Sequence, residues 1–78
     1  MPRYFFDLQD HTLLVDEEGT ELAGIDAARK QALAVLGGIA KDELARQHHD
    51  WFAIHVRDQD GRPVLTASLS VRVETSPQ

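Results

Sequence analysis

Along this chain the spacing of the apolar residues changes from strand-like to helical and back to strand-like. This succession constrains the possible folds more than any other feature of the sequence. Apolar and polar residues alternate over residues 4–8, 12–15, 51–58 and 64–73, which indicates four β-strands. Between the two pairs, a helix that opens at Gly24 or Asp26 and runs to about Gln47 is expected, because apolar positions recur there at a helical period. The order β-β-α-β-β predicts an α+β fold of two layers, with the helix across one face of a four-stranded, mainly antiparallel sheet.

The regularity of the last strand suggests how the strands are arranged. Residues 64–73 form the longest and most regularly apolar strand, so we expect it near the centre of the sheet, beside residues 4–8. The predicted order across the sheet is then 12–15, 4–8, 64–73 and 51–58, with a right-handed crossover.

The chain is short and contains no cysteine. Its 78 residues provide for one core, and the missing cysteines exclude a disulfide scaffold, a thiolate zinc site and a cysteine nucleophile. We expect a single domain over residues 1–74, followed by a frayed tail at 75–78. Gly19 closes the first hairpin region and Asp60-Gly61 predicts a tight turn in the second, because glycine tolerates a positive φ.

The net charge of −5 is concentrated near the start of the chain. Six acidic residues precede Leu22 against one base, Arg3, whereas seven acids and seven bases follow. Nucleic-acid binding is therefore not expected, since it needs surplus Lys and Arg, whereas an acidic surface suits a basic protein partner. The longest uncharged run, 32–40, is too short to span a membrane, and no apolar leader precedes Tyr4, so a cytoplasmic location is expected.

Two surfaces are candidates for protein interaction. The open face of the sheet, away from the helix, is expected to gather aromatic and arginine side chains of the kind enriched at interfaces. On the back of the helix, a row of small residues replaces the usual Lys, Glu or Gln and would let a second helix approach closely. If Phe6 and not Phe5 faces the core, which the sequence leaves open, the open-face residues are Phe5, Trp51, His55, Arg57, Val64 and Arg72. The helix row is Ala27, Ala34, Gly38 and Ala45.

Evidence for catalysis or metal binding in the sequence is weak. His48-His49-Asp50 has metal-ligand chemistry, but adjacent histidines on regular structure point apart, so a solvated helix end is the favoured explanation. A small hydrolase would need His55 to approach Ser68 or Ser70, and neither a third catalytic group nor an oxyanion donor is indicated. We therefore expect no catalytic residue, no cofactor and no metal.

Five short segments that cover nearly the whole chain occur in a fairly specific order. They are Met1-Pro2-Arg3-Tyr4-Phe5-Phe6-Asp7, Asp16-Glu17-Glu18-Gly19-Thr20-Glu21-Leu22, Ala27-Ala28-Arg29, Val56-Arg57-Asp58 and Asp60-Gly61-Arg62-Pro63-Val64. Together they resemble a family of short uncharacterised bacterial proteins, a domain of unknown function. The resemblance implies no activity, cofactor or catalytic residue. In its topology alone, the chain is also similar to the antitoxin partners of small ribonuclease toxins, which join a hairpin to an Ala-rich helix.

The sequence thus favours a small, acidic, non-enzymatic interaction module. It is expected to form a homodimer or to dock an unidentified partner protein, through the open sheet face or the helix back. The alternative is an antitoxin-like regulatory protein that binds a basic toxin or nucleic acid.

Overall fold

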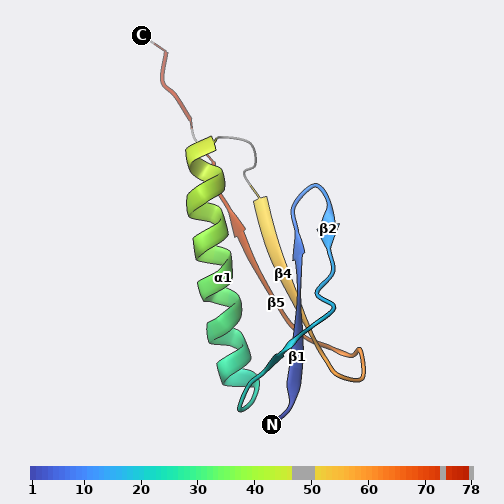
Figure 1. Ribbon diagram of the computed structural model, residues 1–78. Coiled ribbons are helices and arrows are strands. Elements are labelled where there is room, and N and C mark those ends of the chain that lie inside the picture. The colour runs from blue at the N-terminus through green and yellow to red at the C-terminus, as the bar shows by residue number, and fades with distance from the viewer. Residues whose placement is uncertain (47–50, 73, 78) are drawn as a thin grey trace.

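The chain folds into two layers, a β-sheet and one α-helix that runs along one side of it (Figure 1). The computed structural model describes residues 1–46, 51–72 and 74–77, without the side chains of residues 43–46. This architecture confirms the expected α+β class and adds one short strand, β3, that the sequence pattern did not indicate. In chain order the elements are β1 (Arg3–Gln9), β2 (Leu13–Leu14), β3 (Thr20–Glu21), α1 (Ile25–Arg46), β4 (Trp51–Asp58) and β5 (Pro63–Ser70).

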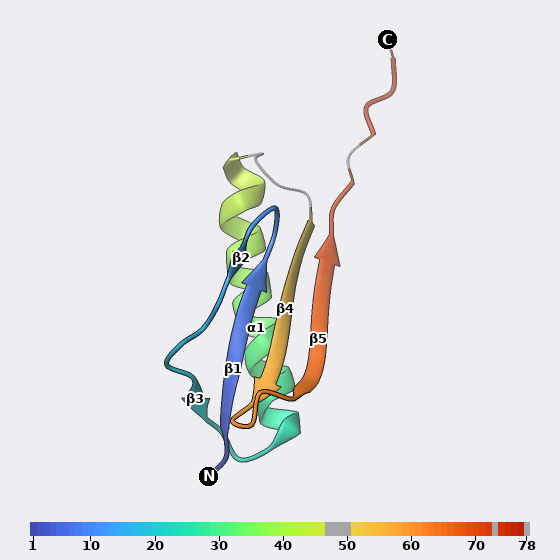
Figure 2. The ribbon, with the colours of Figure 1, turned by 90° about the vertical axis from the view of Figure 1, so that its right-hand side faces the viewer.

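The strands lie in the order β2-β1-β4-β5, and all their pairings are antiparallel (Figure 2). The strand order predicted from the sequence is therefore wrong, because β4, and not the last strand, lies beside β1. The burial of β4 explains this position: Phe52, Ile54 and Val56 on one face and Ala53 on the other are at most 1% exposed. The regular alternation of β5 instead reflects an edge strand with one polar face, and Pro63 at its start suits an edge.

Small residues on α1 allow the helix to pack closely on the sheet. Ala28, Ala32, Leu36 and Ala40 recur every four residues and are at most 4% exposed, and the helix contacts both β4 and β5. With Tyr4 and the inward side chains of β4 they form the core. The half-buried residues packed around this core are Phe6, Leu8, Leu22, Val35, Ile39, Val64, Leu65, Ala67 and Leu69.

The register of β1 settles which of its adjacent phenylalanines faces the core. Phe6 pairs with the buried Val56 and packs against the core, whereas Phe5 pairs with Arg57 on the open face. The alternation predicted for this strand is thereby confirmed. The open face carries Phe5 and its neighbour Asp7 beside the outward side chains of β4.

The last strand is shorter than the sequence pattern indicated. β5 ends at Ser70, whose partner is Trp51, the first residue of β4, so the described residues beyond Ser70 have no strand beside them. A register shift between Val56 and Arg57 also turns Val64 to the core side, which corrects its expected place on the open face.

The helix runs close to its predicted length. It begins at Ile25, in the expected region, and is described to Arg46, while Gln47 lies outside the described residues. Gly37 and Gly38 both lie within it, and a Cβ at either position would meet nothing within 4 Å. Among the described residues, no helix is long and apolar enough to cross a membrane.

Candidate functional site

Strand β1 has two short partners on its outer side, and a cluster of hydrogen bonds fills the gap between them. Leu8 pairs with Leu14 in β2, which confirms the expected hairpin, and Tyr4 pairs with Thr20 in β3. Between these pairings, three residues of β1 face the five residues 15–19, which we call the Asp16 loop. The mismatch prevents a continuous backbone ladder, so other groups must satisfy β1 there.

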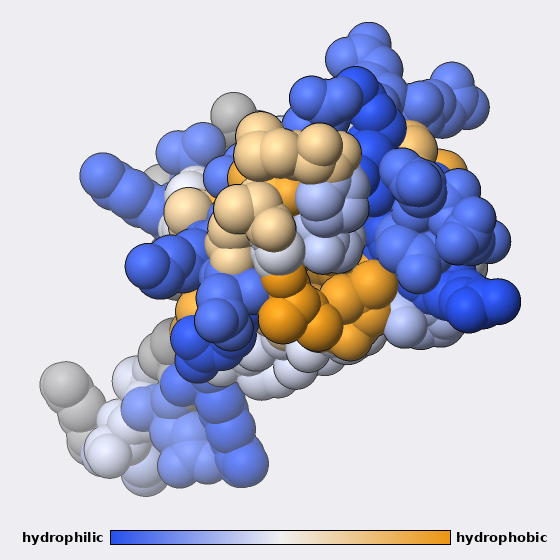
Figure 3. All heavy atoms as spheres, turned by 90° about the horizontal axis from the view of Figure 1, so that it is seen from below, coloured by the Kyte–Doolittle hydropathy of each residue, from blue (hydrophilic) through white to orange (hydrophobic). Residues whose placement is uncertain are grey.

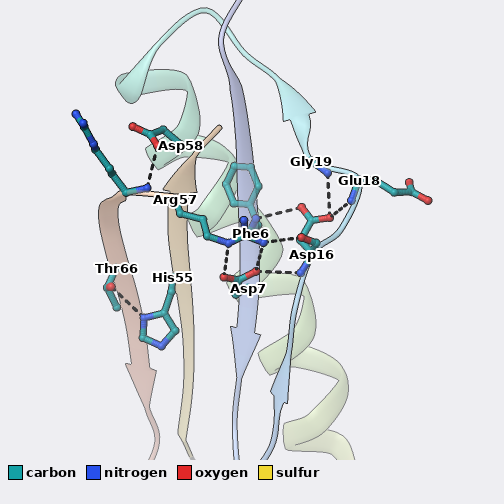
Figure 4. A network of polar contacts seen from close by, with 10 residues as sticks. Phe6, Asp7, Asp16, Glu18, Gly19, His55, Arg57, Asp58 and Thr66 are labelled. Carbon is teal, nitrogen blue, oxygen red and sulfur yellow. Dashed lines mark hydrogen bonds and ion pairs between the residues drawn. The ribbon is translucent and has the colours of Figure 1, made fainter. Parts of the chain in front are cut away.

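The carboxylate of Asp16 takes the place of the missing strand (Figure 4). Its Oδ2 accepts a hydrogen bond of 3.1 Å from the backbone N–H of Phe6, in the middle of the gap. Its Oδ1 accepts two more, both of 3.1 Å, from the N–H groups of Glu18 and Gly19. One side chain therefore closes the loop on itself and ties it to β1.

Arg57 of β4 joins this arrangement from the open face. Its Nε lies 2.9 Å from Asp7 Oδ2, and its Nη2 donates to Asp7 Oδ1 at 3.3 Å and to the Asp16 carbonyl at 2.7 Å. Asp7 also accepts a hydrogen bond of 2.9 Å from the Asp16 N–H. The guanidinium carbon lies 4.6 Å from the ring centroid of Phe5, within cation–π range. The cluster of Asp7, Asp16 and Arg57 thus links β1, β4 and the Asp16 loop.

These contacts shift the pKa values of all three charged groups. Burial by itself raises the pKa of Asp7, but the hydrogen bonds from Arg57 and the Asp16 N–H, with the charge of Arg57, lower it overall. For Asp16, burial is likewise outweighed by the N–H groups of Gly19, Phe6 and Glu18, so its pKa is also lowered. The hydrogen bond to Asp7 raises the pKa of Arg57. The cluster is charged at neutral pH and has the chemistry of a structural ion pair.

His55 occupies the middle of the open face and is held on both sides. Its Nδ1 lies 3.1 Å from Thr66 Oγ1, and its Nε2 lies 2.6 Å from Gln9 Oε1. The His55–Thr66 register places Ser68 opposite Ala53, so His55 does not meet the serines that a hydrolase would have used. A hollow of about 400 Å³ lies nearby, and Asp7 and Thr66 contribute to its lining.

The open-face residues do not form one patch. Phe5 and Arg57 stack at one end, whereas Trp51, 38% exposed, lies at the other end of β4, about 20 Å away along a strand of six residue steps. Arg72 follows the end of β5, where its exposed side chain pairs with Glu74 at 2.5 Å. The interaction role of these residues stays a prediction, with Arg57 already bound within the fold.

The helix row is only partly described. Ala34 and Gly38 are exposed, Ala27 is half-buried, and the side chain of Ala45 lies outside the described residues. A surface of small residues is present at Ala34 and Gly38, and its role in association stays a prediction.

A second surface feature lies on the helix side of the sheet, where α1 does not reach. Phe6 and Leu8 of β1, Leu14 of β2 and Val15 line a hollow of about 590 Å³, with Glu17 at its rim. Leu14 is 68% exposed and Val15 49%, although both are apolar. We call this feature the β1–β2 hollow. The alternating pattern of the sequence does not predict it, but three consecutive apolar residues, 13–15, within an acidic segment could have indicated it. The other two acidic residues that line it are Asp16 and Glu18.

The end of the molecule seen from below also shows hydrophobic residues bordered by hydrophilic ones (Figure 3). This end carries the start of α1, and Ile25, its first residue, is 53% exposed. A smaller hollow is lined by residues 23–27 and Lys30.

No metal site is formed by the described part of the chain. Within it, no group of three or more His, Asp or Glu residues is arranged to hold an ion. The candidate segment His48-His49-Asp50 lies outside the described residues.

Comparison with known proteins places the chain in a family. Residues 3–70 match the family described as a domain of unknown function, DUF6894, so the chain belongs to it. The expected resemblance to a domain of unknown function is thereby confirmed. No curated protein and no solved structure matches the chain.

Proposed function

We propose that this protein is a non-enzymatic, cytoplasmic interaction module that holds a basic amphipathic helix of a partner protein in the β1–β2 hollow. The observation that carries the proposal is the uncovered apolar floor of that hollow, where Leu14 and Val15 are 68% and 49% exposed. Exposed apolar side chains that adjoin one another are typical of binding surfaces.

The dimensions of the two layers explain why this floor is uncovered. Four strands spaced about 4.8 Å apart make a sheet roughly 15–19 Å wide, whereas a helix with its side chains is about 10–12 Å across. One helix therefore covers about two strands, and α1 contacts β4 and β5. The remaining width, over β1 and β2, accommodates one further helix lying beside α1.

The charge around the hollow indicates what kind of helix fits. Glu17 and Glu18 are exposed and line it, and the first 21 residues carry the whole net charge of −5. Lysine or arginine on the polar face of the incoming helix would complement these carboxylates, and its leucine-like side chains would cover Leu8 and Leu14. The alternative function is that of an antitoxin-like protein that binds a basic toxin or nucleic acid. The acidic residues around the hollow favour the basic toxin, so this second candidate is also a protein that binds a basic partner.

The polar groups of the open face support a role without catalysis. His55 is held between Gln9 and Thr66, and Arg57 is held by Asp7 and the Asp16 carbonyl. A hydrolase would need a nucleophile, a base and an oxyanion donor around one point. These contacts instead fix strand positions.

A designed peptide tests the proposal without knowledge of the natural partner. The probe is a helical peptide with leucines along one face and lysines elsewhere, and a matched peptide carries glutamates in place of the lysines. We expect the lysine peptide to bind and to shift the NMR signals of Leu8, Leu14 and Glu17. Leu14→Ser should weaken binding at least about tenfold, because burying a leucine side chain contributes about 1.5–3 kcal/mol and about 1.4 kcal/mol corresponds to a factor of ten.

The control is Leu33→Ser on α1, because Leu33 is 46% exposed and does not line the hollow. It should leave binding unchanged. Equal weakening by both serine variants, equal binding of the glutamate peptide, or no binding of the lysine peptide would each contradict the proposal.

A further inference from the structure

The outer edge of β5 is an unpaired strand edge with no charged residue. β5 pairs with β4 on one side, and its other side has no strand among the described residues. Residues 63–71 contain no Lys, Arg, Asp or Glu, although charges on an edge are a common protection against pairing with another chain. The free edge thus runs along the eight residues of β5, and alternate residues direct their N–H and C=O groups toward it.

The opposite edge of the sheet is different. β2 and β3 are two residues each, and the Asp16 loop separates them. The Asp16 carboxylate already accepts from Phe6 in the gap, and the surrounding segment is acidic. Only β5 therefore presents a long regular edge within the described residues.

From these observations we propose that two copies of the chain pair along β5, antiparallel, with Ser68 opposite Ser68 of the second copy. This inference is independent of the β1–β2 hollow, which lies near the opposite edge of the sheet. It gives the homodimer expected from the sequence a defined interface.

The geometry of an antiparallel ladder restricts the possible registers. Alternate residues direct their N–H and C=O groups to opposite edges, so a residue facing the free edge can oppose only another such residue. A symmetric pair of identical strands is therefore centred on one residue. Each such register keeps the exposed Ser68 row on the open face and the half-buried Ala67 row on the helix face.

Charges next to the strand favour Ser68 as the centre. In that register Arg62 opposes Glu74 of the second copy, and this attraction occurs twice by symmetry. Centring on Ala67 would instead bring Arg62 opposite Arg72, so like charges would meet. With Ser68 at the centre, Val71 also lies opposite Leu65 of the second copy, which gives the chain beyond β5 a partner.

The rest of the molecule accommodates this pairing. The symmetry places both helices on the same face, and because α1 contacts β4 and β5, their axes would be about 10–14 Å apart. Packed helices need about 8–10 Å, so the two do not collide. The net charge of −5 lies in the β1–β3 part of the chain, with β4 between β1 and the interface.

Single-cysteine variants test this register, because the chain contains no cysteine. We expect Ser68→Cys to form a disulfide-linked dimer at least about tenfold faster than Ser70→Cys, because Cα atoms more than about 7 Å apart cannot be bridged. Mixing Thr66→Cys with Ser70→Cys should give the cross-linked heterodimer, since these two positions oppose each other. All three positions are exposed on the same face of β5, and the comparison of Ser68→Cys with Ser70→Cys leaves the contact between Thr66 and His55 intact.

A charge exchange provides the second measurement, by sedimentation equilibrium of the full chain. Arg62→Glu should weaken the dimer, and adding Glu74→Arg should restore it. Cross-linking at equal rates for all three cysteine variants, a monomer at every concentration, or a dimer unaffected by Arg62→Glu would each overturn the proposed interface.

Discussion

Replacing Gly19 by alanine should reveal how tightly the Asp16 loop is fitted against β1. Gly19 has a φ of 74°, and a Cβ there would lie 2.9 Å from Arg3 Cγ and Phe5 Cε1 and 3.0 Å from the carbonyl oxygen of Tyr4. Gly61 has a φ of 84°, and a Cβ there would meet nothing within 4 Å. The two glycines thus share a backbone conformation and differ in their surroundings.

The expected magnitudes follow from this comparison. A left-handed conformation costs an alanine about 1–2 kcal/mol, which should be the whole effect of Gly61→Ala. Gly19→Ala adds overlap with Tyr4 O, which is backbone within β1, and with the Phe5 ring beneath Arg57, where displacement is restricted. Overpacking of this kind costs about 1–3 kcal/mol, so we expect a total of about 2–5 kcal/mol.

Urea unfolding followed by circular dichroism measures both variants. We expect the urea midpoint of Gly19→Ala to be lower than that of Gly61→Ala, with the same m-value for both variants. In thermal unfolding, each kcal/mol corresponds to about 4–8 °C for a domain of this size. Equal destabilisation by the two substitutions would refute the close fit of the loop against β1.

Two further predictions concern the cluster and the helix. Asp16→Asn should lower the free energy of unfolding at neutral pH by about 1–3 kcal/mol, because one carboxylate oxygen becomes an amide donor. Since the folded pKa values of Asp7 and Asp16 lie below 3.8, their stabilisation is present above that pH and is lost as the pH falls below it. Urea midpoints measured against pH should therefore fall in acid, less steeply in Asp16→Asn; an unchanged slope would contradict this. Gly38→Ala should raise stability by roughly 0.5–1 kcal/mol without affecting association, because nothing lies within 4 Å of the added Cβ; weakened association in sedimentation would instead implicate the helix back.

The sequence was sufficient to predict the order of the elements and the faces of the strands. Alternation in β1 put Phe5 and Phe6 on opposite faces, and the structure shows that Phe6 is the one that lies inside. Gly19 and Gly61 were identified as turn residues, and both have positive φ. These features are local, so neighbouring residues alone determine them.

The strand order was not predictable from regularity, because alternation and burial are separate signals. β5 alternates cleanly since one of its faces is exposed, whereas β4 carries apolar side chains on both faces, as a central strand does. Trp51-Phe52-Ala53-Ile54 was the usable signal for the centre of the sheet.

The Asp16 cluster was missed for a different reason. Asp7, Asp16 and Arg57 are separated by up to 50 residues, and in the sequence the two acids resemble the solvated charges around them. Only the register of β1 with β4, and the mismatch in length between β1 and the Asp16 loop, bring them together.

The contrast between the two edges of the sheet also limits how large an assembly of this chain can become. A strand edge that accepts a neighbour can add one chain, but growth continues only if the newcomer offers a second edge of its own. Here the second edge is interrupted at Phe6, whose N–H is already bound by Asp16. The proposed association through β5 would therefore stop at two chains. In that case the carboxylate of Asp16, besides holding its loop against β1, would prevent the growth of longer assemblies.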